Sequence, residues 1–298
     1  MKKPLVSDAR PGIDLHVHST ASDGTLTPSE ILTMAVSLRL KAIAITDHDT
    51  FAGSVAALTA GVPPELHFLT GIEISAAAPV GFPIAGSVHV LGYGIDPGNP
   101  RLAALIERLT VARQNRNPQI IERLNRLGLD LSMAEVAAFA GDGAPGRPHI
   151  AQLMMAKGLV GSVDDAFGRY LGKNGAAYVD KYRSPMDETI DAINQAGGIA
   201  VLAHPVLVGL SAADLFERFL ATLTAMGLTG IEAIYPDHSP AATAEYHRLA
   251  CKYELLITGG SDFHGDLIPD IRMGSGRGDL HVPFSLYEAL AARLGGRS

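Results

Sequence analysis

Histidines and carboxylates end several short apolar segments of this chain, beginning with "GIDLHVH" near its start. His16 and His18 are one residue apart there, and Asp23 follows in the next polar stretch. Alternate side chains of an extended strand share one face, so both imidazoles should project together, with Asp14 beside them. Neutral imidazoles are common metal ligands, and a carboxylate such as Asp14 can orient one from behind. This pair would be half of a metal site, provided that other ligands arrive at equivalent places.

Residues of the same types end most of the segments that follow, and the fourth segment carries one within it. They are Asp47, His48 and Asp49 in "ITDHDT", Glu73 in "GIEIS", His89 in "SVHVLGYG", His204 in "AHP", Asp237 and His238 in "YPDHS", and Asp262 and His264 in "SDFH". Chance would rarely place the 11 histidines of the chain in this way, so we interpret the set as metal ligands. Mixed imidazole and carboxylate ligands suit zinc, manganese or iron, and they are too many for one ion. Two cations bridged by a carboxylate such as Glu73 lower the pKa of a shared water, which favours hydrolysis of phosphate esters or amides.

The elements that must position these groups alternate along the chain. Seven short apolar segments rich in β-branched residues predict strands, at 12–19, 40–49, 66–75, 87–94, 197–205, 230–239 and 255–264. Amphipathic stretches between several of them predict helices, and Thr27 followed by Pro28 marks the start of one. This alternation predicts an α/β fold with a parallel sheet, either a closed barrel or a doubly wound open sheet. A barrel gathers the ends of its strands at one mouth, where catalytic groups collect.

The composition excludes several classes of protein. Of the 298 residues, 47% are hydrophobic and 18% are charged, as in a globular protein with a sizeable core. The formal net charge of -7 argues against broad nonspecific nucleic-acid binding, although it allows a local basic pocket for a small anion. Cys251 is the only cysteine, which excludes an intrachain disulfide. Because we find no apolar run of membrane-spanning length and no signal-peptide core, we predict a cytoplasmic protein without a membrane partner.

The segment 100–182 interrupts the alternation of strands and helices and is rich in helical stretches. We predict that it forms a helical insertion over the mouth of the barrel. For most of the arginines along its first helix a solvated face is the simpler interpretation; these are Arg101, Arg108, Arg113, Arg116, Arg123 and Arg126. Two other stretches, "GRPHIA" and "DKYRSP", offer a second anion site, because guanidinium groups and a lysine suit a phosphate. Its candidate residues are Arg147, His149, Lys181 and Arg183.

The combined set "DLHVHSTASDG", "ITDHDT", "GIEIS", "HVLGYG", "AHP" and "SDFH" resembles the PHP superfamily, named for polymerase and histidinol phosphatase. The resemblance runs from about Ile13 to His264, apart from the middle segment. It implies a distorted (β/α)7 barrel made of residues 1–99 and 183–298, with 100–182 as a helical insertion domain over the C-terminal mouth. The ligands carried over by motif form three groups: His16, His18, Glu73 and Asp262; Glu73, His89 and His204; and Asp23, His48 and His264.

Asp23 departs from the family pattern, since many trinuclear members carry a histidine at that place. A carboxylate still suits manganese or magnesium, although it favours zinc less strongly. We therefore expect two to three divalent metal ions, with Mn²⁺ as the first choice and Fe²⁺ or Zn²⁺ as alternatives.

The insertion and the "GRPHIA" and "KYR" stretches make the chain most similar to the PHP nucleotide phosphoesterases. This resemblance implies a phosphatase that removes the 3′-phosphate from nucleoside 3′,5′-bisphosphates. The alternatives are a 5′–3′ exonuclease on short 5′-phosphorylated oligonucleotides, a histidinol-phosphatase-like phosphomonoesterase, and a metal-stabilised binding module without activity. The intact ligand set argues against the last of these. For the reaction, we expect Glu73 to bridge the ions, His238 to protonate the departing ribose oxygen, and Asp237 to orient His238.

Overall fold

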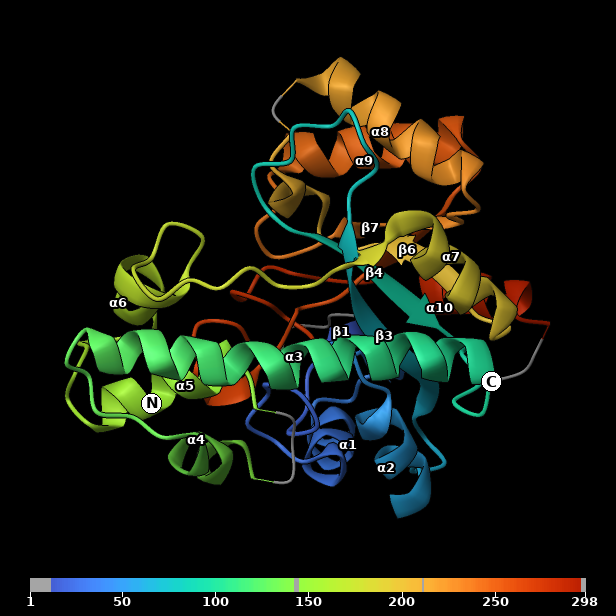
Figure 1. Cartoon of the computed structure of the whole chain (residues 1–298). Helices are drawn as coiled ribbons and strands as arrows, with labels where there is room; N and C mark the ends of the chain where they lie inside the picture. Colours follow the sequence, from blue (N-terminus) through green and yellow to red (C-terminus); the bar gives the residue numbers. More distant parts are fainter. Residues whose placement is uncertain (1–11, 142–144, 211, 296–298) are drawn as a thin grey trace, which may run out of the picture.

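The computed structural model describes residues 12–141, 145–210 and 212–295, and its centre is a curled, mixed β-sheet (Figure 1). The strand order along the sheet is β1-β2-β3-β4-β6-β7-β8, and β5 pairs with the end of β3. All seven predicted strands are present, whereas the two-residue β5 was not predicted because it is too short to show a pattern. The strands are β1 (Asp14–Val17), β2 (Ala42–Ile45), β3 (His67–Ala77), β4 (Val88–Tyr93), β5 (Ser184–Pro185), β6 (Ile199–Leu202), β7 (Gly230–Ile234) and β8 (Leu256–Gly259).

Strand β4 runs antiparallel to both of its neighbours, so the prediction of a wholly parallel sheet is wrong at this strand. Parallel pairing needs a crossover connection, usually a helix. The segment 78–87 between β3 and β4 is described in full and contains no helix. Consequently β4 begins at the edge of the sheet where the parallel strands end, and His89 lies opposite Ser75 of β3.

The two outer strands of the sheet meet and close it into a distorted barrel. Val17 of β1 forms a parallel bridge with Phe263, just after β8. The amide of His18 donates to the carbonyl of Phe263 at 2.9 Å, and the amide of Asp262 donates to the carbonyl of His16 at 2.9 Å. This closure confirms the predicted barrel and excludes the doubly wound open sheet.

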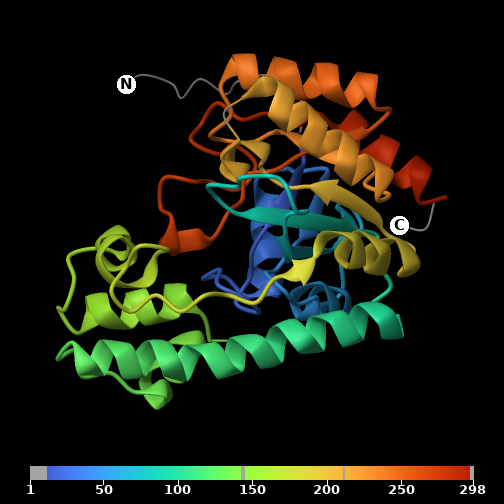
Figure 2. The same ribbon diagram turned by 45° about the horizontal axis from the view of Figure 1, so that its top comes forward.

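Helices surround the barrel, and Figure 2 shows α3 on the side away from α8 and α9. Thr27 caps α1 as predicted, because its hydroxyl accepts a hydrogen bond from the amide of Glu30, whose carboxylate accepts one from the amide of Thr27. None of the described helices is long and apolar enough to cross a membrane. The barrel helices are α1 (Pro28–Ser37), α2 (Ala52–Ala60), α7 (Met186–Gln195), α8 (Ala213–Ala225), α9 (Pro240–Lys252) and α10 (Phe284–Arg293).

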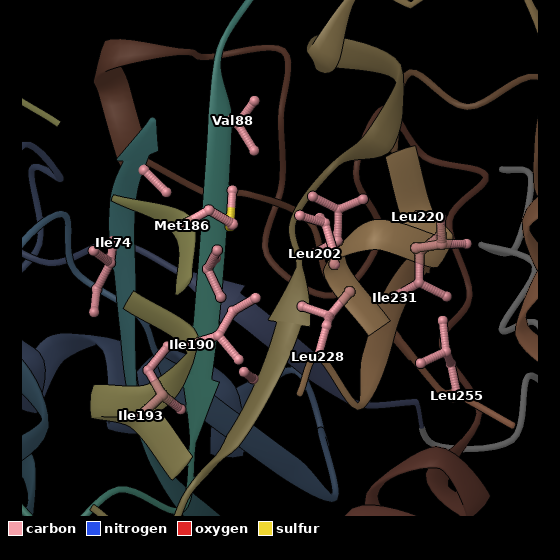
Figure 3. Packing of buried hydrophobic residues seen from close by; sticks show 14 of the residues in the cluster. Ile74, Val88, Met186, Ile190, Ile193, Leu202, Leu220, Leu228, Ile231 and Leu255 are labelled. Carbon is pink, nitrogen blue, oxygen red and sulfur yellow. The ribbon is translucent and has the colours of Figure 1, made fainter. Parts of the chain in front are cut away.

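The largest apolar cluster packs between the sheet and the helices α7, α8 and α9 (Figure 3). Ile74 of β3, Val88 of β4 and Leu202 of β6 meet Ile190 of α7 in this cluster, and all four are buried. Burial of a side chain of this size contributes about 1.5–3 kcal/mol. Because successive side chains of a strand point to opposite faces, packing of Ile74 on the helices directs Glu73 into the barrel.

Helix α3 (Pro100–Arg126) joins the barrel to the helices that follow. Its first half buries Leu102 and Leu109 in the barrel core, and its second half buries Ile120 and Leu124 in a separate apolar cluster with α4 and α5. One continuous helix therefore fixes the position of the later helices relative to the barrel mouth. These are α4 (Met133–Ala140), α5 (Arg147–Ala156), α6 (Val163–Ala166) and a π-helix at Phe167–Leu171.

Candidate active site

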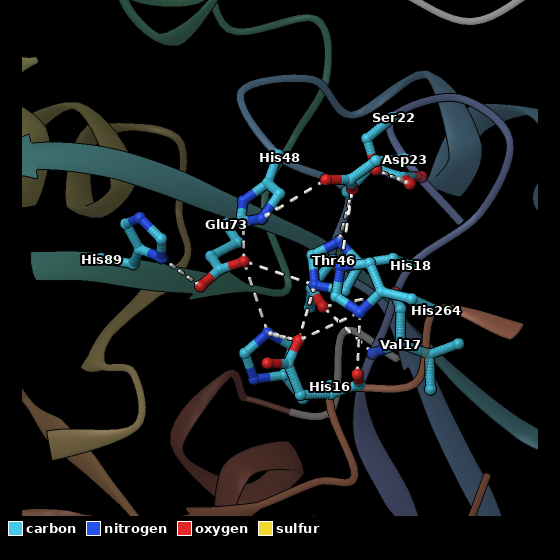
Figure 4. A network of polar contacts seen from close by, with 12 residues as sticks. His16, Val17, His18, Ser22, Asp23, Thr46, His48, Glu73, His89 and His264 are labelled. Carbon is cyan, nitrogen blue, oxygen red and sulfur yellow. Dashed lines mark hydrogen bonds and ion pairs between the residues drawn. The ribbon is translucent and has the colours of Figure 1, made fainter. Parts of the chain in front are cut away.

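Glu73 lies fully buried in a cluster of imidazoles at the barrel mouth (Figure 4). On one side, its Oε2 is 3.4 Å from Nε2 of His16 and 3.3 Å from Nε2 of His18. The same two ring nitrogens lie 3.3 and 3.1 Å from Oδ1 of Asp262. One donor atom from each of these four residues lies within 4.8 Å of the others, which is close enough to hold one ion. This group has the composition predicted for the first site.

On the other side of Glu73, Oε1 is 2.8 Å from Nδ1 of His89 and 2.8 Å from Nε2 of His204. Nδ1 of His89 and Nε2 of His204 are 3.3 Å apart. Nδ1 of His48 approaches Oε2 at 2.8 Å, so that His48, Glu73 and His89 form a further group of donor atoms. The two carboxylate oxygens of Glu73 thus face two groups of imidazoles, as a bridging carboxylate does.

The remaining predicted ligands lie around Asp23. Its Oδ1 is 3.5 Å from Nε2 of His264 and 3.8 Å from Nδ1 of His18, and its Oδ2 is 4.0 Å from Nε2 of His48. His48 therefore stands between Asp23 and Glu73, whereas the sequence placed it with Asp23 alone. The structure brings all nine predicted ligand residues into one continuous cluster.

Burial and charge act in opposite directions on these groups. Burial alone would lower the pKa of His18, but its contacts with Asp262 and Glu73 raise that pKa to about 10. Burial would raise the pKa of Asp23, but neighbouring imidazoles hold it well below its usual range. Within the described chain, Nε2 of His16 and of His18 and Oε2 of Glu73 are buried and make no hydrogen bond. Such a donor set fits divalent ions. A bound ion would replace the protons that the neighbouring carboxylates favour on these imidazoles.

Buried carboxylates behind the cluster hold its backbone and rings in place. Asp14 accepts hydrogen bonds from the amides of Ser261 and Gly274, at 2.8 and 2.7 Å, and so fixes the chain after β8. The prediction that Asp14 orients an imidazole is wrong, because its carboxylate accepts hydrogen bonds from these backbone amides instead. Glu232 of β7 takes that place, with Oε1 2.9 Å from Nδ1 of His16. Sequence reasoning missed Glu232, although an acidic residue inside the apolar stretch "GIEAIY" was a usable signal.

A cavity of about 210 Å³ connects the ligand cluster with a group of cations. Asp23, His48 and His89 line this cavity together with five cations. Two of the cations, Arg113 and Arg116, belong to α3, so the interpretation of its arginines as a solvated face is wrong for these two; Arg116 is only 6% exposed. The sequence could not show which face of α3 the barrel mouth covers. The five cations are Arg113, Arg116, Arg147, Lys181 and Arg183.

Three of these five cations have a carboxylate partner. Oδ2 of Asp49 is 2.7 Å from Nη2 of Arg113 and 3.0 Å from Nζ of Lys181. Burial opposes ionisation of Asp49, but the charges of Lys181 and Arg113 outweigh it and hold the pKa of Asp49 well below its usual range. Arg183 pairs with Asp180 at 3.1 Å.

Arg116 and Arg147 differ from the other cations, because neither forms an ion pair with a carboxylate of the described chain. Nε and Nη1 of Arg116 are buried without a hydrogen-bond partner there. Burial and the charges of Arg147 and Arg113 lower the pKa of Arg116 to about 10. Nη1 of Arg147 donates to the carbonyl of Leu171 at 3.0 Å, and its guanidinium lies 5.6 Å from the centre of the Phe167 ring. Arg116 is buried and Arg147 is half-buried, so two cations without a carboxylate partner lie beside this cavity, a setting that favours an anion.

Three other predicted site residues make contacts of a different kind. His149 is buried on α5, and its Nδ1 accepts the amide of Gly146 at 3.0 Å. Nδ1 of His238 lies 2.9 Å from a backbone carbonyl of β7, and burial lowers its pKa. Asp237 pairs with Arg277 at 3.2 Å and not with His238. The substrate and proton-transfer roles of these residues stay predictions.

The family model of the PHP domain matches residues 14–199, which is more than half of the chain. The chain belongs to the PHP family. A solved structure of a Bifidobacterium adolescentis protein, assigned as a metal-dependent phosphoesterase, is similar with a TM-score of 0.84 and 30% sequence identity. The match covers 96% of this PHP chain and 97% of that one. The fold is therefore that of a PHP-type metal-dependent phosphoesterase, and the chain carries a cluster of histidines and carboxylates able to bind metal ions.

Curated relatives of this PHP chain carry several related activities. It is 32% identical to the 3′,5′-nucleoside bisphosphate phosphatase of Chromobacterium violaceum, over 85% of this chain and 87% of that one. It is 33% identical to the 5′-3′ exoribonuclease Rnm of Escherichia coli, over 84% of each chain. It is 35% identical to the phosphoribosyl 1,2-cyclic phosphate 1,2-diphosphodiesterase of Eggerthella lenta, over 85% of this chain and 94% of that one. All three names describe hydrolysis of a phosphate ester on a ribose.

Proposed function

We propose that this PHP protein hydrolyses the 3′-phosphate of nucleoside 3′,5′-bisphosphates and releases a nucleoside 5′-monophosphate and phosphate. The observation that carries the proposal is the single cavity that joins the ligand cluster to Arg116 and Arg147. A bisphosphate has one phosphate for the ligand cluster and a second for these cations. Near pH 7 a phosphate monoester carries a charge of about -1.5 to -2, which matches the two cations without a carboxylate partner.

The proposed ion sites follow the geometry of the cluster. When bound, divalent ions supply a water activated for attack and neutralise charge on the phosphoryl group. We take Mn²⁺ as the first choice, because carboxylate and imidazole ligands without thiolates suit it, with Fe²⁺ and Zn²⁺ as alternatives. The ligands would be His16, His18, Glu73 and Asp262 for the first ion, Glu73, His89 and His204 for the second, and Asp23, His48 and His264 for a third position.

Residues of the chain itself would bind the substrate and supply a proton to the departing 3′-oxygen. Arg116 and Arg147 would hold the 5′-phosphate, with Lys181 beside them at the wall of the cavity. This fixes the nucleotide so that its 3′-phosphate reaches the ligand cluster. His238 remains our candidate for protonation of the departing 3′-oxygen. A slower release of phosphate by His238→Asn at unchanged metal content would support that role.

The test compares two substrates that differ in one group. Protein loaded with Mn²⁺ should release phosphate from adenosine 3′,5′-bisphosphate with a kcat/KM about 10- to 100-fold higher than from adenosine 3′-monophosphate. The proposed arginines of the cavity, Arg116 and Arg147, gain a charge-assisted hydrogen bond only with the first of these substrates. Equal rates on both substrates, or no release from either, would refute the proposal.

Exonuclease activity is the second candidate, because it requires the same two groups on the substrate. A 5′-phosphorylated oligonucleotide presents a terminal phosphate for Arg116 and Arg147, and its next phosphate lies at the 3′-oxygen of the first nucleotide. A 5′-phosphorylated dinucleotide distinguishes the activities, since an exonuclease releases a nucleoside 5′-monophosphate from it. The corresponding dinucleotide without a 5′-phosphate is the control.

A further inference from the structure

Glu232 is a fully buried carboxylate that contacts two of the proposed ligand residues from behind. Its Oε1 is 2.9 Å from Nδ1 of His16. Its Oε2 accepts a hydrogen bond from the backbone amide of His204 at 2.7 Å. His16 faces the group completed by Asp262, whereas His204 faces the opposite oxygen of Glu73. One carboxylate therefore supports residues on both sides of the bridging glutamate.

The backbone at His204 needs this support. His204 has φ 25° and ψ 68°, a left-handed conformation that is unfavourable for a residue with a side chain. It follows strand β6 directly, and the hydrogen bond from its amide to Glu232 ties this turn to β7. The conformation directs Nε2 of His204 to Oε1 of Glu73, at 2.8 Å.

The contact with His16 decides which ring nitrogen faces the cluster. A proton on Nδ1 is donated to Glu232, which leaves the lone pair of Nε2 directed at Glu73 and Asp262. A carboxylate behind the ring also makes the imidazole a stronger ligand. Glu232 would thus act on the first site by fixing the tautomer of the His16 ring. It would act on the second site by fixing the backbone of His204.

We propose that Glu232 is a positioning residue that couples the two ion sites, an inference that rests on the ion sites of the proposed function. Loss of the Glu232 carboxylate should lower the affinity of both sites for their ions. The comparison residue is Tyr235, whose hydroxyl donates to Oδ2 of Asp262 at 3.0 Å and supports a ligand of the first site alone.

The experiment titrates Mn²⁺ alone into metal-free protein by calorimetry, so the readout does not depend on turnover. Glu232→Gln keeps the shape of the side chain but cannot accept from both partners, and it should weaken both binding steps by about 10- to 100-fold. Tyr235→Phe, the matched control, should weaken one step and leave the other as in the wild type. Thermal unfolding of the metal-free proteins identifies a variant that fails to fold.

A second measurement needs no variant. Histidine ¹⁵N NMR of the zinc-loaded wild type should show His16 bound through Nε2, with a slowly exchanging proton on Nδ1. Binding through Nδ1, wild-type affinity in Glu232→Gln, or weakening of only one step in that variant would each overturn the inference. If phosphate release fails on every substrate while the two steps weaken together, the proposed function is wrong and the coupling through Glu232 stands.

Discussion

We call the part of the cavity lined by Arg113, Arg116, Arg147, Lys181 and Arg183 the proposed anion pocket. Replacement of Arg116 by methionine tests this pocket, because it should raise the stability of the protein and lower its preference for a second phosphate. The first effect is on stability. Burial and the charges of Arg147 and Arg113 lower the pKa of Arg116 to about 10, a shift that corresponds to about 3 kcal/mol against the charged side chain. Methionine is of similar length and uncharged, so the free protein should recover part of this energy. The midpoint of thermal unfolding of Arg116→Met should rise by a few degrees.

The second effect of Arg116→Met is on substrate choice. A charge-assisted hydrogen bond contributes about 1.5–3 kcal/mol, so its loss should lower kcat/KM for a nucleoside 3′,5′-bisphosphate by about 10- to 100-fold. The same variant should hydrolyse a nucleoside 3′-monophosphate at close to the wild-type rate, because that substrate lacks the group that Arg116 would hold. A more stable protein with a poorer preference for the second phosphate is the expected combination.

The assay measures phosphate release from both substrates and thermal unfolding with and without inorganic phosphate. Arg126→Met is the matched control, since Arg126 lies on the same helix, pairs with Glu122 and is exposed. The control should match the wild type in every measurement. Equal losses on both substrates, or a clear fall in stability of Arg116→Met, would refute the reasoning and make Arg116 a structural residue.

Three further predictions concern the ligand cluster and the surface. Glu73→Gln should abolish phosphate release and lower the metal content while circular dichroism stays unchanged; metal-free protein with full activity would contradict it. Asp23→Ala should empty only the third position in elemental analysis, and loss of every ion would show that the sites are not separate. Hydrogen bonds from Lys252 and Arg248 lower the pKa of Glu217 to about 2, so its stabilisation is complete above the ordinary pKa of 4.5 and disappears as the pH falls through 2. The difference in unfolding midpoint between wild type and Glu217→Gln should therefore be largest near neutral pH and absent near pH 2.

That the predicted ligands come together could be foreseen from the sequence, because most of them lie in or directly after an apolar strand that is recognisable on its own. Strand ends converge in a closed barrel whatever the details of packing, so residue types and order were sufficient. The direction of β4 could not be predicted from its own residues, since it depends on the connection that precedes it. His89 still reaches the cluster, because reversal of β4 brings the start of that strand to the mouth.

The anion pocket was only partly predictable, because its geometry depends on contacts between distant segments. Arg147, Lys181 and Arg183 were found from their place in short polar stretches, and all three line the cavity. Arg113 and Arg116 look like other arginines of an amphipathic helix. What distinguishes them is that the barrel mouth covers their face of α3, and this requires the three-dimensional arrangement.

Three consecutive residues explain how the ligand cluster and the anion pocket keep a fixed spacing. Asp47 accepts from the amide of Ser19 at 2.8 Å and so holds the turn that leads to Asp23. His48 points into the cluster, with Nδ1 2.8 Å from Glu73.

Asp49 has a left-handed backbone conformation, with φ of 55°, and its carboxylate contacts Arg113 of α3 and Lys181. The amide of Asp49 donates to the carbonyl of Glu73 at 2.8 Å, so the position of Asp49 is tied to that of Glu73. A shift of the cations would therefore pull on the backbone of Glu73, and a shift of the ligand cluster would move Asp49. Asp49 thus ties two of the cations that line the cavity to the backbone beside the ligand cluster, which favours a fixed separation between the cluster and these cations.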